Sequence, residues 1–386
     1  MEKSIEIESS WFKKNLKGDP VIWAVAIILA IISILTVYSA AGAYAFKKFG
    51  GNTEAPLIKQ LAYIGLSLGM MWLAHKIDYR YYAKIALICL IISVPLLLMT
   101  KFFGTNINSA SRWLKIPFVG ITFQPSDLAK FALIAYLSSI LAKKQQVITD
   151  IKTLDEIKET FLPMLSWIGV ICGLILWSNA SNGLVLFATC MLLMIIGRVP
   201  FKYLLILCLI GMMAGGVALF NGQRAKTFIS RIEKFTSGKA SDIPYQLEHS
   251  YIAIATGGIT GKGPGNSTER NFLPHPYSDF IYAIIIEEYG LIGGAAVLFL
   301  FLVLLYRGMV TVARSERAFG GLLSAGLSFA LFMQAFVNMG VAVGIGPVTG
   351  LPLPLVSMGG TSLLFTGISL GIILSVSKGE VEEENN

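Results

Sequence analysis

Residues 278–306 read Ser278-Asp-Phe-Ile-Tyr-Ala-Ile-Ile-Ile-Glu-Glu-Tyr-Gly-Leu-Ile-Gly-Gly-Ala-Ala-Val-Leu-Phe-Leu-Phe-Leu-Val-Leu-Leu-Tyr306. This apolar run is long enough to cross a membrane as a helix, because a span needs about 20 residues. Its first turns nevertheless carry three acids, Asp279, Glu287 and Glu288. A carboxylate at membrane depth costs roughly 2.5–3.5 kcal/mol on insertion scales, so these acids require polar surroundings within the protein. The preceding stretch, residues 221–277, is rich in glycines, hydroxyls and basic side chains that could supply them.

The remaining sequence has the composition of a polytopic membrane protein. Apolar residues make up 55% of the 386 residues and charged residues only 14%, whereas a soluble domain carries about 25% charged residues. We therefore expect an all-α fold with one transmembrane domain over residues 21–377, a tail over residues 1–20 and an acidic tail over residues 378–386. The length of the eighth and ninth spans predicts either a tilt or a kink at Gly290, Gly293-Gly294 or Gly344. The ten candidate spans are residues 21–46, 57–76, 82–100, 125–142, 161–178, 181–197, 201–220, 278–306, 319–345 and 358–377.

Basic residues indicate the orientation of these spans. Short connections on one side carry lysines and arginines, such as Lys143 and Lys144 after the fourth span and Arg314 and Arg317 after the eighth. Because basic residues gather in cytoplasmic loops, we expect both termini in the cytoplasm and the loop over residues 221–277 outside. Two predicted outer loops, 101–124 and 221–277, are also basic, which we interpret as functional. The net charge of +8 mostly reflects this topology, and no basic soluble module points to a nucleic-acid partner.

Asp279 has two interpretations. An acid at the first turn of a helix often acts as an N-terminal cap, since the helix dipole favours negative charge there. Alternatively, a carboxylate at the boundary between membrane and water is placed to take a proton from a sugar hydroxyl. Eight residues further on, Glu287 would lie about 12 Å deeper and could line the same cavity from below. Glu288 would point roughly opposite Asp279, so it must find a partner elsewhere.

A second group of polar residues lies in Arg112-Trp and in Phe123-Gln-Pro-Ser-Asp-Leu-Ala-Lys130. Pro125 suits the first turn of a helix. Asp127 and Lys130 are three residues apart and share one helical face. The pair is either a structural ion pair inside the membrane or a site at which Lys130 faces a lipid pyrophosphate. The two roles are compatible.

A third group comprises Asn338 and the stretch Pro347-Val-Thr-Gly-Leu-Pro-Leu-Pro-Leu-Val-Ser-Met-Gly-Gly-Thr-Ser362. Three prolines and three glycines interrupt the chain between two spans. Irregular backbone at membrane depth is tolerated only where protein or a water-filled cavity satisfies its polar groups. We therefore expect a re-entrant segment that lines a cavity, rather than a plain outer turn.

The outer loop over residues 221–277 has internal order of its own. Residues 225–236 place Phe228, Ile232 and Phe235 on one face, which predicts a helix that lies on the outer membrane surface. Basic side chains in this loop either contact lipid head groups or bind substrate. They are Arg224, Lys226, Arg231, Lys234 and Lys262.

Together these segments resemble the SEDS family of shape, elongation, division and sporulation proteins, which includes FtsW, RodA and SpoVE. The resemblance covers nearly the whole chain: ten spans, the large outer loop before the eighth, and motifs in the family's order. The motifs are Ser111-Arg-Trp with Gln124-Pro-Ser-Asp-Leu-Ala-Lys130, the loop residues Gln246, Ser250, Gly257-Gly258 and Gly261-x-Gly-x-Gly-Asn-Ser267, the segment His275-Pro-Tyr-Ser-Asp279-Phe with Glu287-Glu-x-Gly290, and Pro347-x-x-Gly350-x-x-x-Pro354-x-x-Ser357-x-Gly-Gly-Thr-Ser362.

The resemblance implies a peptidoglycan glycosyltransferase that polymerises lipid II, an undecaprenyl-pyrophosphate disaccharide-pentapeptide, outside the bacterial cytoplasmic membrane. It aligns Asp279 with the family's catalytic acid, proposed as general base. A charge network is expected at Asp127, Glu287, Glu288 and Asn338. Substrate contacts are expected at Arg112, Lys130, Gln246, Ser250, Lys262, Asn266, Ser267, Ser357 and Thr361.

The resemblance also implies partners. The family's usual partner is a monofunctional class B penicillin-binding protein, and we expect other membrane proteins of the division machinery as well. A divalent cation, Mg²⁺ or Mn²⁺, would assist at the pyrophosphate through unknown ligands, and no organic cofactor is implied. The charged N-terminal tail and Val37-Tyr-Ser-Ala40 favour a division-type, FtsW-like member at the septum over an elongation-type one. A lipid II flippase or a structural recruiter are the alternatives, but the strongest motif lies at the outer surface, where polymerisation occurs.

Three positions depart from the family pattern. Asn179 stands in the turn between the fifth and sixth spans, where relatives often have an acid. Asp127 replaces the commoner glutamate and has a shorter reach. Thr349 occupies a position where some division-type relatives carry lysine, so a cation is missing from the last outer turn.

Overall fold

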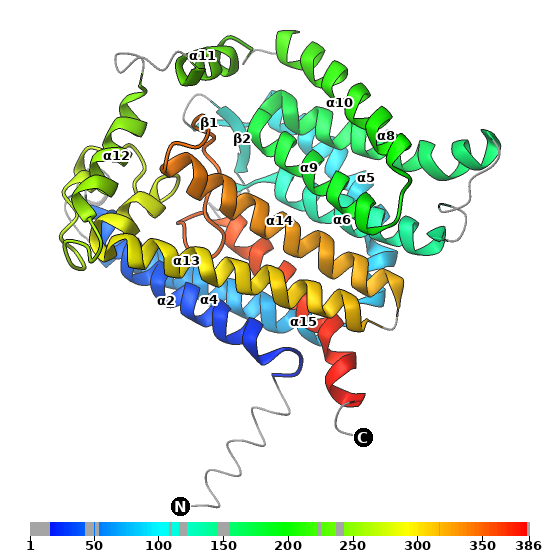
Figure 1. Cartoon of the computed structure of the whole chain (residues 1–386), viewed down its shortest axis with the longest axis horizontal. Coiled ribbons are helices and arrows are strands. Elements are labelled where there is room, and N and C mark those ends of the chain that lie inside the picture. The colour runs from blue at the N-terminus through cyan, green and yellow to red at the C-terminus, as the bar shows by residue number, and fades with distance from the viewer. Residues whose placement is uncertain are drawn as a thin grey trace, which may run out of the picture.

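The helices of the chain pack into one bundle. The structure is a computed structural model that describes residues 16–42, 50, 54–107, 110–115, 122–145, 148, 154–221, 225–236, 243–315 and 317–383. Within these residues, ten helices occupy the ranges predicted as spans (Figure 1). They are α2 (Pro20–Ala40), α4 (Glu54–Lys76), α5 (Arg80–Phe103), α6 (Pro125–Lys143), α8 (Leu154–Ser178), α9 (Ala180–Ile196), α10 (Phe201–Asn221), α13 (Ile281–Arg314), α14 (Ala318–Ala342) and α15 (Thr361–Glu383).

Not all of these helices have the length and apolarity of a full span. Seven of the described helices do, namely α2, α4, α5, α8, α13, α14 and α15. Helices α9 and α10 contribute the shorter apolar segments Ala180–Ile196 and Phe201–Met212. Helix α6 carries Asp127, Lys130 and Lys143 and is not among the seven. Among the described residues, seven helices therefore have the length and apolarity of a full span, and three further helices complete the bundle. That these three also cross the membrane stays a prediction.

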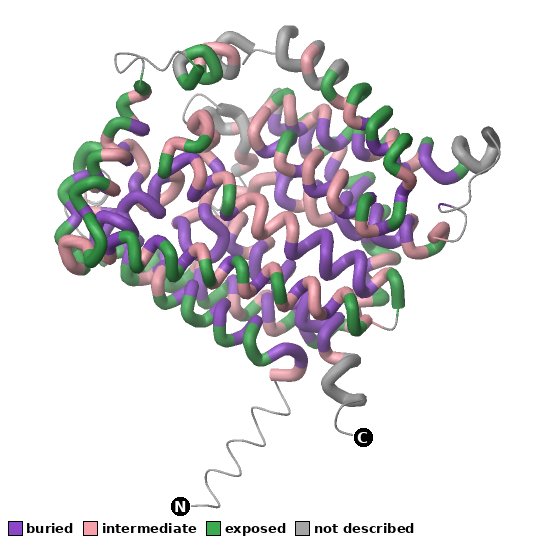
Figure 2. The backbone as a smooth tube through the Cα atoms, viewed as in Figure 1, coloured by how far each residue is buried: buried purple, intermediate pink, exposed green. Residues whose placement is uncertain are grey.

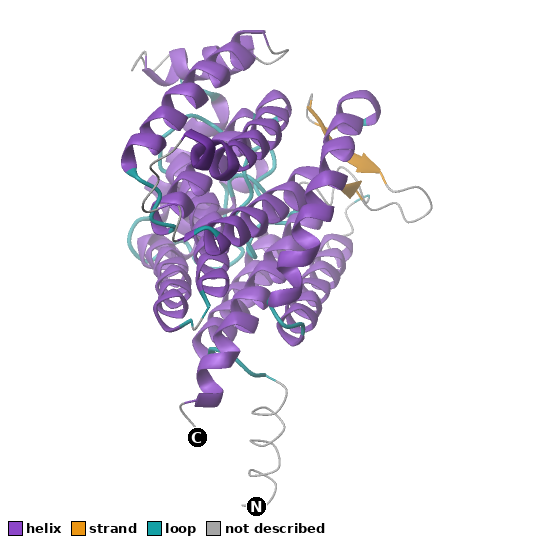
Figure 3. Ribbon diagram, turned by 90° about the vertical axis from the view of Figure 1, so that its right-hand side faces the viewer, coloured by secondary structure: helices purple, strands orange, loops and turns teal. Residues whose placement is uncertain are grey.

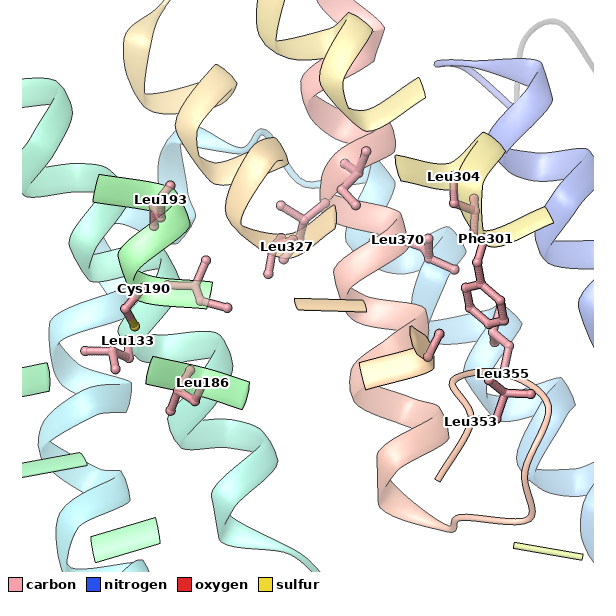
Figure 4. Close-up of a cluster of buried hydrophobic side chains, with 14 of the residues drawn as sticks. Leu133, Leu186, Cys190, Leu193, Phe301, Leu304, Leu327, Leu353, Leu355 and Leu370 are labelled. Carbon is pink, nitrogen blue, oxygen red and sulfur yellow. The ribbon is translucent and has the colours of Figure 1, made fainter. Parts of the chain in front are cut away.

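The centre of the bundle is formed by α14 and α15, which are the most buried of the apolar helices (Figure 2). Helix α15 packs along α4, α13 packs along α14, and α5 packs along α6. Figure 4 shows part of the apolar core, with Leu133 and Cys190 on one side and Phe301 and Leu370 on the other. Exposed apolar side chains lie on the outer helices, as expected for a surface that faces lipid.

A small antiparallel β-sheet interrupts the helical pattern between α5 and α6. Its strands are β1 (Thr105–Ile107), β2 (Ala110–Lys115) and β3 (Thr122–Phe123), in the order β1-β2-β3. Figure 3 shows these strands at the side of the bundle. The all-α prediction missed the sheet, because strands this short leave little periodicity to detect. Arg112 lies on β2, and its side chain is outside the described residues.

The two described ends of the chain meet at one end of the bundle (Figure 1). Asp19 caps α2 by accepting a hydrogen bond from the amide of Val21, at 2.8 Å. Its own amide donates to the hydroxyl of Ser377 on α15, at 3.0 Å. Its second carboxylate oxygen lies 2.5 Å from the guanidinium of Arg307 on α13. A single buried acid therefore ties three helices together at this end.

The loop over residues 221–277 contains two helices. The predicted surface helix is present as α11 (Ala225–Thr236), on which Ile232 and Phe235 are each 39% exposed. A second helix, α12 (Tyr245–Gly257), and a 3-10 turn, η2 (Glu269–Asn271), were not predicted. Arg224 and the side chains of Lys226, Phe228 and Lys234 lie outside the described residues.

Candidate active site

Helix α13 is broken at Gly290, where the backbone adopts φ 70° and ψ −174°. The residues after α12 pair with this break. The amides of Lys262 and Gly263 donate to the carbonyl oxygens of Glu287 and Glu288, both at 2.9 Å. In return, the amide of Leu291 donates to the carbonyl oxygen of Gly258, also at 2.9 Å. The loop thus satisfies backbone groups that the break would leave unpaired within the membrane. Of the glycines predicted as alternative kink positions, Gly290 is the one at which α13 breaks.

Glycine is required where loop and helix meet. A Cβ atom at Gly290 would lie 2.0 Å from the carbonyl oxygen of Ile259. A Cβ atom at Gly261 would lie 2.2 Å from the carbonyl oxygen of Glu288, and one at Gly257 would lie 2.2 Å from that of Ile286. These neighbours are backbone atoms that cannot rotate away. The spacing of the glycines in the sequence therefore records a close backbone approach rather than flexibility.

Gly290→Ala is expected to detach the loop from α13 and to lower the melting temperature of the purified protein. A residue with a side chain at φ 70° and ψ −174° costs of order 1–3 kcal/mol, and here the contact with Ile259 adds to that cost. Gly65→Ala is the matched control, because Gly65 lies within α4 and a Cβ atom there would have no neighbour within 4 Å. Limited proteolysis of the loop over residues 257–271 measures the detachment. A Gly290→Ala protein as stable and protease-resistant as Gly65→Ala would contradict this account.

Glu287 anchors the loop from within α13. Its side chain is fully buried, with an exposed fraction of 0%. The ammonium of Lys262 lies 2.6 Å from one carboxylate oxygen, and the amide and hydroxyl of Thr268 both donate to that oxygen at 2.9 Å. The hydroxyl of Ser267 donates to the other oxygen. The expectation that Glu287 lines a cavity below Asp279 is wrong, since its carboxylate is enclosed by the loop.

Glu288 connects the loop to α2. Its carboxylate accepts hydrogen bonds from the hydroxyl of Ser39, near the end of α2, and from the amide of Ser267, at 3.3 Å. Arg270 completes the contact by donating to the carbonyl oxygen and hydroxyl of Ser39, at 3.2 and 3.1 Å. The prediction that Glu288 finds a partner away from Asp279 is confirmed, and neither Ser39 nor Arg270 could be identified from the sequence.

Asp279 lies just before α13, on the loop side of the site. The N-terminal cap of α13 is Phe280, without a side-chain capping bond, so Asp279 does not occupy the cap position. Its side chain is partly exposed and accepts a hydrogen bond from the hydroxyl of Ser278, at 2.9 Å. Its carbonyl oxygen accepts one from the side-chain amide of Asn338, also at 2.9 Å. Asp279 therefore lies one residue before the cap position, and its catalytic role stays a prediction.

The segment after α14 holds Asp279 in place. Asn338, which is 1% exposed, also donates to the carbonyl oxygen of Leu351, at 2.7 Å. The hydroxyl of Ser357 donates to the carbonyl oxygen of Ser278, at 2.6 Å, and a Cβ atom built at Gly350 would lie 3.4 Å from Asp279 Oδ2. The side chains of Leu353, Leu355 and Val356 are at most 1% exposed. This irregular backbone is buried in protein, which favours the re-entrant segment over a plain outer turn.

Arg231 reaches this segment from α11. Its guanidinium donates to the carbonyl oxygen of Val348, at 2.8 Å. Burial lowers the pKa of Arg231, and the negative charge of Asp279 opposes that shift. A fixed cation therefore stands within electrostatic reach of Asp279. The sequence placed Arg231 in a basic set but offered no reason to single it out.

Lys130 and Asp127 form the predicted ion pair, with 3.0 Å between Nζ and Oδ1. Asp127 is 5% exposed, and Lys130 Nζ also lies 3.4 Å from the side-chain oxygen of Gln334 on α14. The pair lines a cavity of about 50 Å³ between α6, α9, α14 and α15, next to Ser362 and Thr366. A cavity of this size holds only a few water molecules and no sugar. The contacts shown are those of a structural pair.

Several predicted substrate contacts are made to the protein instead. The hydroxyl of Ser250 donates to the carbonyl oxygen of Ala342 at 2.7 Å, which fixes α12 to the end of α14. The side-chain amide of Asn266 donates to the carbonyl oxygen of Lys262 at 3.0 Å, and the hydroxyl of Thr361 accepts from the backbone amide of Gln124 at 3.2 Å. Gln246 lies half-buried in the first turn of α12. Substrate binding by these residues stays a prediction.

Comparison with known proteins identifies the family. A family model described as "Cell cycle protein" and named for FtsW, RodA and SpoVE matches residues 19–382. A protein described as probable peptidoglycan glycosyltransferase FtsW from Haemophilus influenzae is 32% identical over 373 residues, which cover 94% of this chain and 91% of that protein. Stage V sporulation protein E from Bacillus subtilis is 30% identical over 370 residues, which cover 95% of this chain and 98% of that protein.

Solved structures share the fold. A chain of a peptidoglycan synthase complex that coordinates polymerization and crosslinking superimposes with a TM-score of 0.73 at 23% identity, over 93% of this chain and 97% of that one. The rod shape determining protein RodA of Thermus thermophilus superimposes with a TM-score of 0.66 at 25% identity, over 93% of this chain and 96% of that one. Because the family model and the relatives extend over almost the whole sequence, this multi-pass membrane protein belongs to the FtsW/RodA/SpoVE family.

Proposed function

We propose that the protein is a peptidoglycan glycosyltransferase that polymerises lipid II at the outer face of the cytoplasmic membrane, with Asp279 as general base. The observation that carries the proposal is the placement of Asp279. Its carboxylate is partly exposed, its backbone is fixed by Asn338 and Ser357, and the loop beside it is locked to α13. A general base must be held within reach of the proton that it removes, and this support provides that placement. The relatives' names support the same activity.

The proposed reaction joins two substrates at this site. A sugar hydroxyl of one lipid II molecule attacks the anomeric carbon of the other substrate. The bond from that carbon to the pyrophosphate oxygen then breaks. Asp279 takes the proton of the attacking hydroxyl, and undecaprenyl pyrophosphate leaves with the bonding electron pair. Arg231, which stands within electrostatic reach of Asp279, would stabilise the charge on the leaving group.

A divalent cation is compatible with this arrangement only if the substrate supplies most of its ligands. Among the described residues, no group of three or more His, Cys, Asp or Glu could hold a metal ion. Mg²⁺ is commonly bound by one or two carboxylates together with substrate phosphates, and Asp279 could provide such a carboxylate. The ion would then neutralise charge on the pyrophosphate.

Purified protein tests the activity directly. With a class B penicillin-binding protein as partner, it should convert fluorescently labelled lipid II into glycan strands on a gel. Vesicles that contain the protein provide the contrasting assay. Movement of lipid II across the vesicle membrane without any polymer, in the presence of that partner, would support the flippase alternative and contradict the glycosyltransferase.

The cellular role is proposed as septal synthesis together with a transpeptidase of this class. The support is the FtsW name of several relatives, although the SpoVE protein is almost as similar and RodA shares the fold. A fluorescent fusion expressed at native level should gather at midcell. An even distribution along the side wall would assign the protein to elongation instead.

Topology follows from the same proposal, and a cysteine at Thr260 tests it. Thr260 is exposed in the loop beside α13, whereas Lys202 is exposed at the opposite end of the bundle, in the first turn of α10. In a background without the four native cysteines, Thr260→Cys should react with an impermeant maleimide in intact spheroplasts. Lys202→Cys should react only after permeabilisation, because the basic connections are expected inside. The reverse pattern would place the site in the cytoplasm and rule out polymerisation outside.

A further inference from the structure

The end of the bundle opposite Asp279 contains a second cavity. Helix α13 separates the two ends, since its 34 residues begin beside Asp279 and finish at Arg314 (Figure 1), a length of roughly 50 Å for a continuous helix. At the far end, a cavity of about 790 Å³ lies between the α4–α5 turn, the last turns of α6 and the start of α14. The proposed reaction uses none of the residues that line it.

This cavity is strongly basic. Four cations from three segments line it: Arg80 and Lys84 at the start of α5, Lys143 at the end of α6 and Arg317 before α14. One acid, Asp78, lines it as well, and its carboxylate is already 3.1 Å from Arg80. The other three cations form no ion pair with an acid among the described residues. All four cationic residues are exposed, so their charges can meet a ligand that enters.

Neutral hydrogen-bond donors lie at the same cavity. Arg317 is the N-cap residue of α14, and no side chain caps that helix, so amides of its first turn are available at Ala318 and Phe319. Such a helix terminus favours an anion. Ser139 lines the cavity from α6 while only 6% exposed, and its hydroxyl has no hydrogen-bond partner within the described part of the chain. The cations, the free amides at the start of α14 and the hydroxyl of Ser139 are together suited to bind the oxygens of a phosphate group.

The surroundings of the cavity indicate where the phosphate comes from. Tyr81 lines the cavity and is 56% exposed, and Ile77 and Ile85 beside it are 45% and 44% exposed. Exposed apolar and tyrosine side chains next to basic ones mark the level where a membrane meets water. A ligand at this level can extend acyl chains along α5 while its phosphate lies among the cations. Basic pockets between membrane helices bind anionic lipid head groups in this way.

We propose that this cavity is a binding site for the head group of an anionic phospholipid of the leaflet opposite the Asp279 site. The two-phosphate lipid cardiolipin is the best match, because the cavity holds an excess of three positive charges, four cations against one acid. The two phosphodiesters lie among Lys84, Lys143 and Arg317, and the amides at the start of α14 and the hydroxyl of Ser139 donate the remaining hydrogen bonds. The proposal does not depend on the reaction at Asp279.

Lipid retention by the full-length protein tests the proposal. The protein is purified in detergent, cardiolipin or phosphatidylcholine is added, and bound lipid is counted by native mass spectrometry while the melting temperature is recorded. Cardiolipin should bind and raise the melting temperature, and phosphatidylcholine should do neither. The double variant Lys84→Gln/Arg317→Gln should weaken cardiolipin binding at least five-fold.

The control variant carries the same loss of two charges at the same end. Lys76→Gln/Lys202→Gln removes exposed cations outside the cavity and should bind cardiolipin like the parent. Both double variants should melt like the parent without lipid. Equal cardiolipin binding by all three proteins would overturn the proposal. Failure of the parent protein to retain cardiolipin would also overturn it, because the cavity would then bind no lipid of this class.

Discussion

Asp279→Asn should fold, insert and bind its transpeptidase partner, yet make no detectable glycan strand from lipid II. Asparagine preserves the size of the side chain and its ability to accept a hydrogen bond from Ser278. It cannot hold the proton of the attacking hydroxyl. A positioned base contributes about 10²–10⁴-fold to a rate, so we expect polymerisation to fall by at least that lower factor. The measurement is the initial rate of strand formation from labelled lipid II.

The control for this prediction is another acid of the same loop. Glu248 is exposed in the first turn of α12, and Glu248→Gln removes one negative charge without touching Asp279 or its supports. Its rate should stay close to that of the parent. If Asp279→Asn polymerises within a few-fold of Glu248→Gln, then Asp279 is not the base.

Lys130→Met should also abolish most activity, because the substitution breaks the buried ion pair between Lys130 and Asp127. Asp127 is buried, with an exposed fraction of 5%. The substitution removes the ammonium of Lys130, which lies 3.0 Å from its carboxylate. Breaking a buried pair in this way typically costs about 3–5 kcal/mol. We therefore expect a lower melting temperature together with strongly reduced polymerisation.

A double variant separates the two roles of Lys130. Asp127→Asn/Lys130→Met removes both charges, so its stability should recover towards that of the parent. If the pair is purely structural, polymerisation recovers with it. If Lys130 also faces a lipid pyrophosphate in another state of the enzyme, the double variant folds but stays inactive. Full activity of Lys130→Met at normal stability would show that neither role matters.

The sequence predicted the helices and the break in α13 because their signals are local. Apolar runs of span length set the helices, and Gly290 set the break. The Asp127–Lys130 pair was also predictable, since both residues share one helical face. The role of Glu287 was not predictable, because helical geometry gives the direction of a side chain but not the segment that packs against it. Only the folded loop shows that Lys262 and Thr268 enclose its carboxylate.

Contacts between distant segments were invisible for the same reason. No periodicity links Ser39 to Glu288, and none links Ser250 to Ala342. The short strands around Arg112 and the helix α12 have mixed polar and apolar residues that favour no single element. Substrate roles for Gln246, Asn266 and Thr361 depend on a bound state, so neither pattern nor fold decides them.

The hydrogen bond between Ser39 and Glu288 has a consequence for how the protein is made. The two residues are 249 positions apart in the sequence. A second hydrogen bond of α2, from the hydroxyl of Ser33 to the carbonyl oxygen of Val356, joins residues that are 323 positions apart. During translation the first helix enters the membrane long before its partners leave the ribosome. The Asp279 region therefore cannot be completed until nearly all of the chain has been synthesised and inserted. A chain that ends before Val356 therefore lacks this contact between α2 and the segment that precedes α15.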